Sequence, residues 1–144
     1  LTEPYIEAIG QFSPDGRYVA YASRESGSVE DIVVASFPDP SAGKWPMTNG
    51  GGFQPRWRRD GRELLYFTGN GKLTSVDVTL TPTFRAGAAK TLFEPPVFEG
   101  GGSGGRAVWD LTPDGQRFLI ITSASGESSS PLHVVLNWQA GLKK

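Results

Sequence analysis

Two residues have the chemistry of a hydrolase nucleophile and its base, Ser103 and His133. Ser103 stands in the run Gly-Gly-Ser-Gly-Gly at 101–105, which matches the G-x-S-x-G pattern of a serine held on a sharp turn between a strand and a helix. Here proline and glycine precede the run and a predicted strand follows it, so we interpret it as a flexible loop. His133 is the only histidine, and no ordered Ser-His-acid arrangement is evident around it. We therefore interpret His133 as structural and predict no catalytic residue.

Residue types that hold metal ions and phosphates are scarce or wrongly spaced. With one histidine and no cysteine, the sequence argues against a protein zinc site. Asp and Glu leave a hard-cation site open, although no D-x-D-x-D-G spacing occurs. Gly69-Asn70-Gly71-Lys72 lacks the upstream glycine of a phosphate-binding loop and predicts a hairpin turn. We predict no metal ligand and no cofactor, and the sequence leaves the binding residues unknown.

A turn ending in Asp-Gly occurs three times and contains Asp15, Asp60 and Asp114. Ser-Pro-Asp-Gly at 13–16 and Thr-Pro-Asp-Gly at 112–115 suit a type I turn, because proline presets φ at the second position and glycine accepts a left-handed conformation at the fourth. Arg-Arg-Asp-Gly at 58–61 lacks the proline and should be less pre-organised. The three aspartates would suit a ligand or metal ring. The alternative, which we favour, is that each one hydrogen-bonds its own turn.

A short apolar run follows each turn, and it does not alternate cleanly between apolar and polar residues. Such runs bounded by turns suit strands that are covered on both faces. With these runs as central strands, the sequence predicts strands at 7–12, 18–23, 31–36 and 45–48, then at 53–57, 63–68, 72–78 and 90–93, and finally at 106–111, 117–122 and 132–138. No segment has a sustained 3.6-residue apolar period, so almost no helix is expected.

The repeat divides the chain, as a single domain, into units at about 3–48, 52–94 and 105–140. Units of about 45 to 50 residues with four short strands are typical of β-propeller blades. The predicted fold is therefore all-β, a partial β-propeller of three four-stranded antiparallel sheets. Only residues 139–144 follow Trp138, so the third sheet is expected to have three strands or to borrow its fourth. Residues 79–87 are expected to be a linker with an extended conformation.

Composition excludes several classes of partner. A net charge of −1 provides no basic field for nucleic acid or anionic lipid. No apolar stretch approaches the ~18 residues of a membrane span. The absence of cysteine excludes disulfides but does not fix the compartment. The chain starts at Leu1 without a signal peptide, so we expect a mature product or an excised fragment.

Four tryptophans are candidates for a binding surface. Trp57 precedes its turn at the place that Phe12 and Leu111 occupy in the other copies, which predicts a core anchor. Trp109 and Trp138 have no such register and are interpreted as partly exposed contacts. Trp45 lies in a short predicted edge strand, where Pro46 can be tolerated.

Residues 12–21 (Phe-Ser-Pro-Asp-Gly-Arg-Tyr-Val-Ala-Tyr) and 111–120 (Leu-Thr-Pro-Asp-Gly-Gln-Arg-Phe-Leu-Ile) resemble the WD40-like PD40 repeat of TolB-type bacterial β-propellers. The ending at 134–144 resembles the carboxyl terminus of propellers fused behind bacterial serine/threonine kinases, although the chain has no kinase motif. The resemblance implies a non-catalytic sensor or interaction module of a larger bacterial protein, which binds a protein or peptide. It also implies a periplasmic or extracytoplasmic location.

The chain departs from this family in its number of repeats. Such propellers usually close with six or more blades, and three are predicted here. Apolar faces left open at both ends would favour association, so we expect a fragment of a longer protein or a self-assembling half of which two copies close a ring. Leu1-Thr2 resembles the end of a strand that would complete another copy's last sheet, or that of the same chain.

Two further functions stay open from sequence alone. One is the gating propeller of a serine peptidase similar to prolyl oligopeptidase, whose hydrolase domain would lie outside this chain. The other is an autonomous three-sheet scaffold without a ligand. Genetic context would separate the first from the interaction module, and the mass in solution would test the second.

Overall fold

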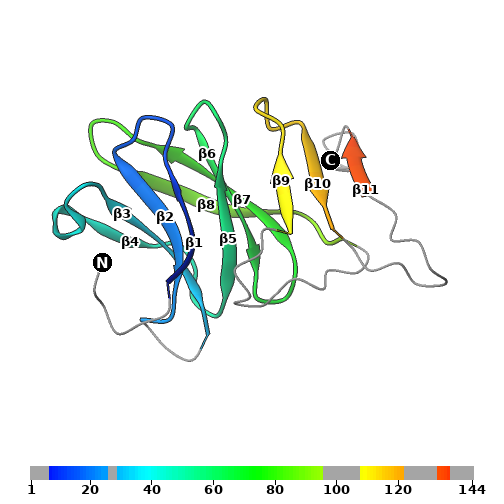
Figure 1. The fold of residues 1–144 in the computed structure, drawn as a ribbon, viewed down its shortest axis with the longest axis horizontal. Coiled ribbons are helices and arrows are strands. Elements are labelled where there is room, and N and C mark those ends of the chain that lie inside the picture. The colour runs from blue at the N-terminus through cyan, green and yellow to red at the C-terminus, as the bar shows by residue number, and fades with distance from the viewer. Residues whose placement is uncertain (1–6, 26–28, 96–107, 122–132, 137–144) are drawn as a thin grey trace.

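The computed structural model describes residues 7–25, 29–95, 108–121 and 133–136 of the chain. In these ranges the protein is all-β, with eleven strands in three antiparallel sheets that follow one another along the long axis of the molecule (Figure 1). The helical structure of the described residues is a single 3-10 turn, η1 (Pro40–Ala42). The predicted fold class is confirmed.

Each sheet is a meander, in which strands that are neighbours in the sequence are also neighbours in the sheet. Sheet 1 contains β1 (Glu7–Phe12), β2 (Tyr18–Ser23), β3 (Asp31–Ser36) and β4 (Lys44–Pro46). Sheet 2 contains β5 (Gly52–Trp57), β6 (Glu63–Thr68), β7 (Leu73–Thr79) and β8 (Arg85–Phe93). Sheet 3 contains β9 (Trp109–Leu111), β10 (Arg117–Ile120) and β11 (His133–Leu136), so its described part has three strands where a full blade was predicted to have four.

The three Asp-Gly turns close the first hairpin of each sheet with the same hydrogen bonds. The N–H of Gly16 donates to the carbonyl of Ser13 at 2.8 Å, and the equivalent bonds at Gly61 and Gly115 are 2.9 and 2.8 Å long. All three glycines have φ of 70°, the left-handed conformation that glycine adopts without a Cβ clash. The turn predicted from the repeat is therefore confirmed in every copy, including the one that lacks proline.

The predicted linker at 79–87 is wrong, because the outer strand of sheet 2 already begins at Arg85. Leu80 and Phe84, which precede this strand, are buried in the core. The ring of Phe84 lies 5.5 Å from that of Tyr18 and 5.1 Å from that of Trp45, so it fills the space between sheets 1 and 2. The burial of Leu80 and Phe84 was not predicted because proline at position 82 is typical of a connecting segment.

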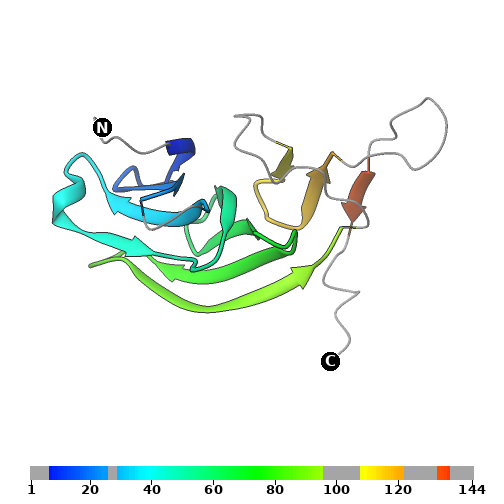
Figure 2. The same ribbon diagram turned by 90° about the horizontal axis from the view of Figure 1, so that it is seen from below.

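The core of the protein lies between the sheets, and the sheets stand side by side in a curved row with β8 along the convex side (Figure 2). One apolar cluster joins sheets 1 and 2, and its members include Tyr18, Ala20, Val34, Trp57, Leu64 and Tyr66. A second joins sheets 2 and 3 and includes Leu65, Phe67, Leu73, Trp109, Phe118 and Ile120. Within the described ranges, sheet 2 is thus covered on both faces by other sheets, whereas sheets 1 and 3 each have one neighbouring sheet. A third, smaller buried cluster of Tyr21, Val33 and Ala35 lies on the other side of sheet 1.

Among the described residues there is no helix of the length and apolar character needed to cross a membrane.

Candidate interaction surface

Asp15, Asp60 and Asp114 each serve the turn in which they stand. Each carboxylate accepts the main-chain N–H two residues further on, at 3.1, 3.1 and 3.0 Å respectively. Each also accepts a side chain from two residues earlier, which is Ser13 (2.6 Å) in the first copy and Thr112 in the third. The interpretation as turn-forming aspartates is confirmed, because each carboxylate is held by its own hairpin.

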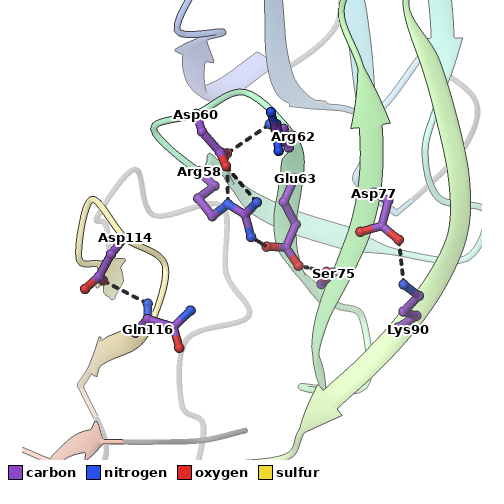
Figure 3. Close-up of polar contacts among 9 residues, drawn as sticks. All are labelled: Arg58, Asp60, Arg62, Glu63, Ser75, Asp77, Lys90, Asp114 and Gln116. Carbon is purple, nitrogen blue, oxygen red and sulfur yellow. Dashed lines mark hydrogen bonds and ion pairs between the residues drawn. The ribbon is translucent and has the colours of Figure 1, made fainter.

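In the second copy an arginine takes the place of the hydroxyl. The guanidinium of Arg58 forms a fork on the carboxylate of Asp60, with both N–O distances at 2.8 Å (Figure 3). This paired charge lowers the pKa of Asp60 from its ordinary value to about 2, helped by the main-chain N–H of Arg62. The fork holds the turn that has no proline, so a charged pair replaces the pre-organisation that proline supplies in the other copies.

Arg58 also connects the turn to the interior of sheet 2 and to sheet 3. Its second terminal nitrogen lies 2.8 Å from the carboxylate of Glu63, which in turn accepts the hydroxyl of Ser75 (Figure 3). A Cβ added at Gly115 would lie 2.6 Å from Cδ of Arg58, so the arginine stem packs directly against the turn of sheet 3. The hollow of about 550 Å³ beside Arg58 and Asp60 is lined by this ion pair together with Arg62 and Asp77. We interpret this cluster as structural.

The joint between sheets 1 and 2 has a polar clamp made by Gln11 and Trp57. The side-chain oxygen of Gln11 accepts the main-chain N–H of Trp57 at 2.8 Å, and the indole N–H of Trp57 donates to the main-chain oxygen of Gln11 at 3.0 Å. Trp57 is 5% exposed, which confirms that it is a core anchor. The indole thus has its one donor satisfied while its rings are packed in the joint.

A similar clamp holds sheets 2 and 3 together. The side-chain oxygen of Gln54 accepts the N–H of Val108 at 3.0 Å, and the indole of Trp109 donates to the main-chain oxygen of Gln54 at 3.1 Å. Gln54 has φ of 53° at a bulge in β5, so the strand bends there to present both oxygens. The predicted partial exposure of Trp109 is wrong: it is 2% exposed because the clamp draws it into the joint.

Side chains of the central strand of sheet 2 alternate between the two neighbouring sheets. In sheet 2, Leu64 and Tyr66 of β6 face sheet 1, whereas Leu65 and Phe67 face sheet 3. Successive residues of a strand point to opposite faces, so a strand with two neighbours is apolar at every position. This is the physical reason for the unbroken apolar run of β6.

Sheet 1 has aromatic side chains exposed on the face turned away from sheet 2. Phe12 pairs with Val19 across β1 and β2, as Trp57 pairs with Leu64 in sheet 2. Phe12 is 54% exposed and Phe37 is 48% exposed, and the two rings meet edge to face with centroids 4.8 Å apart. We call Phe12, Val19 and Phe37 the open face of sheet 1, and Tyr21, Val33 and Ala35 further along the same side form a small buried cluster. An exposed aromatic pair of this kind is typical of an interaction surface.

The same side of sheet 1 is hollowed at its other end. A hollow of about 520 Å³ is lined by Val33 and Pro46 and by the ion pair of Lys44 with Glu25. Burial lowers the pKa of Lys44, but the carboxylate of Glu25 and the hydroxyl of Tyr21 outweigh it, and the pKa is raised. The hollow therefore combines an apolar floor with a fixed cation and anion, which suits a peptide or protein better than a purely apolar ligand.

Sheet 3 has an open face of its own. Along β10, Phe118 and Ile120 are buried against sheet 2, whereas Leu119 is 41% exposed, and Ile121 just beyond the strand is 57% exposed. Leu119 and Ile121 with Arg117 point the other way, and we call them the open face of sheet 3. Its apolar members are exposed because no described part of the chain packs against that side.

Several residues chosen from the sequence lie outside the described part of the chain. Ser103, Trp138 and Leu1-Thr2 are among them, so their predicted roles stay predictions. The backbone of His133 lies in β11 opposite Ile120. The hairpin predicted at Gly69-Asn70-Gly71 is confirmed, since the N–H of Gly71 donates to the carbonyl of Thr68 at 2.9 Å.

Residues that matter in the joints escaped the sequence reading. Gln11 and Gln54 stand at different distances from their turns, so the repeat alone does not align them. The one signal available was a polar amide inside a strand predicted to be buried, which requires a hydrogen-bond partner. Among the described residues, no group of three or more His, Cys, Asp or Glu side chains is placed to hold a metal ion.

No family model and no curated protein matches the chain. Among solved structures, it is similar to TolB from Acinetobacter baumannii, with 21% identity and a TM-score of 0.61 over 90% of this chain and 30% of that one. It is similar to oligogalacturonate lyase from Vibrio parahaemolyticus, with 16% identity and a TM-score of 0.58 over 82% of this chain and 30% of that one. An oligogalacturonate lyase in complex with manganese matches with 18% identity and a TM-score of 0.55, over 78% and 27% of the two chains.

These likenesses are all below 25% identity and show the fold alone. The three sheets have the fold of part of a TolB-like β-propeller, in which each sheet is a blade. The chain spans about 30% of the length of the first two of these structures.

Proposed function

We propose that the chain is a non-catalytic β-propeller module of the PD40 type that binds protein or peptide through its open blade faces, its own second copy included. The observation that carries the proposal is the open face of sheet 1. The equivalent face of sheet 2 holds Trp57 at 5% exposure under a covering sheet, whereas Phe12 at the matching place is 54% exposed. Covering a large apolar side chain contributes about 1.5–3 kcal/mol, so Phe12 and Phe37 together offer a partner a substantial gain.

The use of the turn carboxylates supports a non-catalytic role. General acid and base work needs a carboxylate that can reach a substrate. Asp15, Asp60 and Asp114 are instead engaged by their own hairpins, and Glu63 is engaged by Arg58 and Ser75. The ending that resembles kinase-fused propellers suggests that the module is the carboxyl-terminal sensor or interaction part of a larger bacterial protein.

Binding is tested by selecting peptides on the immobilised chain from a random displayed library. An enriched peptide is then labelled and titrated in fluorescence anisotropy. We expect the double variant Phe12→Ser/Phe37→Ser to bind it at least about tenfold more weakly, as when interface anchors are removed. The matched control is Phe84→Leu, which changes an aromatic residue in the interior joint and should leave peptide binding unchanged. Equal affinity of the wild type and the double variant would contradict the proposal.

Catalysis is tested separately. Because two of the similar structures are oligogalacturonate lyases, one of them with manganese, oligogalacturonate with and without Mn²⁺ is the first substrate to try. Generic ester and peptide substrates cover the alternative of a peptidase-associated propeller. We expect no turnover above background. Turnover that Ser103→Ala abolishes would overturn the non-catalytic proposal.

A further inference from the structure

The two filled joints of the molecule are each built from two unlike halves. The earlier sheet contributes one side of its central strand, such as Tyr18 and Ala20 in the first joint and Leu65 and Phe67 in the second. The later sheet contributes the other side, such as Leu64 in the first joint and Phe118 in the second. A blade face therefore has a polarity, and the two halves of a joint are not interchangeable.

The open face of sheet 1 is a later-sheet half. Phe12 lies opposite Val19 as Trp57 lies opposite Leu64. The N–H of Phe37 donates to the carbonyl of Arg17, as the N–H of Val78 donates to that of Arg62. Trp57, Leu64 and Val78 all belong to the cluster that sheet 1 covers. What covers this kind of face in the molecule is thus the earlier-sheet half of another blade.

The open face of sheet 3 is an earlier-sheet half. Leu119 stands at the same distance after Asp114 as Leu65 does after Asp60, and Leu65 faces the following sheet. Ile121 matches Phe67 in the same way. Sheets 1 and 3 therefore present the two unlike halves of one joint.

One residue of opposite charge stands at a matching place on the rim of each open face. In the first joint, the hydroxyl of Tyr18 reaches across to the main-chain oxygen of Leu80, beyond the third strand of the next sheet, at 3.1 Å. The residues at the matching places on the open faces are Arg117 and Asp39, both exposed. Hydrogen bonds from the hydroxyl and the N–H of Ser41 lower the pKa of Asp39, so its carboxylate keeps its charge. A joint between the open faces would thus bring the side chain of Arg117 to the segment that carries Asp39.

We propose that a second copy of this chain occupies these faces head to tail, with Leu119 and Ile121 of one copy packed on Phe12, Val19 and Phe37 of the other. Two-fold symmetry repeats the contact and closes a ring of six sheets. The inference rests on the proposed function of the open faces as protein-binding surfaces, and it adds the identity and the polarity of one partner.

The experiment uses the full chain and two double variants in sedimentation equilibrium. The wild type is expected at twice the monomer mass of 15.5 kDa. Phe12→Ser/Phe37→Ser and Leu119→Ser/Ile121→Ser are each expected to be monomeric, because each keeps only one half of the joint. An equimolar mixture of the two variants is expected to form dimers again through the one intact joint, with an affinity below that of the wild type.

Three results would overturn the inference. One is a wild type that stays monomeric at high concentration; if the selected peptide still binds it, the proposed function survives alone. Another is a double variant that still dimerises by itself, which would mean a contact between like faces. The third is a mixture of the variants that stays monomeric although both are folded by circular dichroism.

A charge exchange keeps the test decisive should a serine variant fail to fold. Arg117→Asp and Asp39→Arg are each expected to weaken the dimer at least about tenfold, and the variant with both changes is expected to recover most of the loss. Equal weakening in the single and double variants would contradict the pairing of Arg117 with Asp39.

Discussion

Leu65 and Leu119 occupy the same place in two copies of one repeat, and their surroundings differ completely. Leu65 in the middle sheet is 1% exposed, whereas Leu119 in the last sheet is 41% exposed. Both stand in a central strand after an Asp-Gly turn, and both point away from the preceding sheet. The difference is that Leu65 has a following sheet beside it. The exposure of these two leucines is therefore decided by the neighbouring blade and not by the residue type or the strand.

Trp57 and Phe12 make the same comparison on the opposite faces. Both precede the turn, and only Trp57 has an earlier sheet against it. The comparison shows that the exposed apolar residues of sheets 1 and 3 stand at the places that are buried between two sheets elsewhere in the protein. Four tests, taken from the largest expected effect to the smallest, can break or sharpen this comparison.

Trp57→Ala is expected to lower the free energy of unfolding by about 3–5 kcal/mol, because it leaves a cavity in the first joint and removes the indole bond to Gln11. Phe12→Ala, the same change at the matching open place, is expected to cost less than about 1 kcal/mol in the monomer. Urea unfolding at low protein concentration measures both. Similar losses would mean that the two faces do not differ.

Ile120→Ala is expected to cost about 2–5 kcal/mol, since this side chain is 1% exposed in the second joint. Its neighbour Leu119 points to the open face, so Leu119→Ala is expected to stay within about 1 kcal/mol of the wild type. Thermal unfolding of the pair tests the alternation within a single strand. A costly Leu119→Ala in the monomer would show that its side is covered.

Gln11→Leu is expected to cost about 1–3 kcal/mol, because the N–H of Trp57 then loses its acceptor inside the joint. Gln116→Leu, a change of the same residue types at a turn where the main-chain N–H makes the bond, serves as the control and is expected to be nearly neutral. Denaturant midpoints at matched slopes give both values. If Gln11→Leu leaves the free energy of unfolding unchanged, the hydrogen bonds between Gln11 and Trp57 do not stabilise the joint.

Asp60→Asn is expected to have the smallest effect, below about 1 kcal/mol, because the pair with Arg58 is partly exposed to solvent, which screens it. The pKa of Asp60 is depressed from 3.8 to about 2 in the folded protein, so its contribution is fully present above about pH 4. It is lost as the pH falls toward 2, where the folded carboxylate is protonated. The difference between wild type and variant should therefore shrink over that interval, and a difference that grows would contradict the fork.

Much of the fold was predictable because each copy of the repeat contains the residues that form its turn and its strands. The Asp-Gly turns and the apolar runs predict the bounds of β1, β2, β3 and β6 as the structure has them. The structural roles of the turn aspartates and of Trp57 followed from aligning the three copies of the repeat. These features depend on residues close in the sequence, which is why one copy could be used to interpret the next.

The rest depends on contacts between sheets. Phe84 fills a gap between blades, and Trp109 is buried by its bond to Gln54, which lies in the previous sheet. The open faces are also invisible in the sequence, because Leu65 and Leu119 look alike there. Only the arrangement of the blades separates a residue in a joint from one at an end.

Single cysteines test the central claim most directly, since the chain has none of its own. Leu65→Cys and Leu119→Cys, with Leu64→Cys as a second buried position, are labelled with a maleimide at a dilution that keeps the protein monomeric. The account predicts that the cysteine at 119 reacts at least about a hundredfold faster than those at 64 and 65, which need local opening of a joint to react. Equal labelling at 65 and 119 would contradict the claim that the side of sheet 3 turned away from sheet 2 is open.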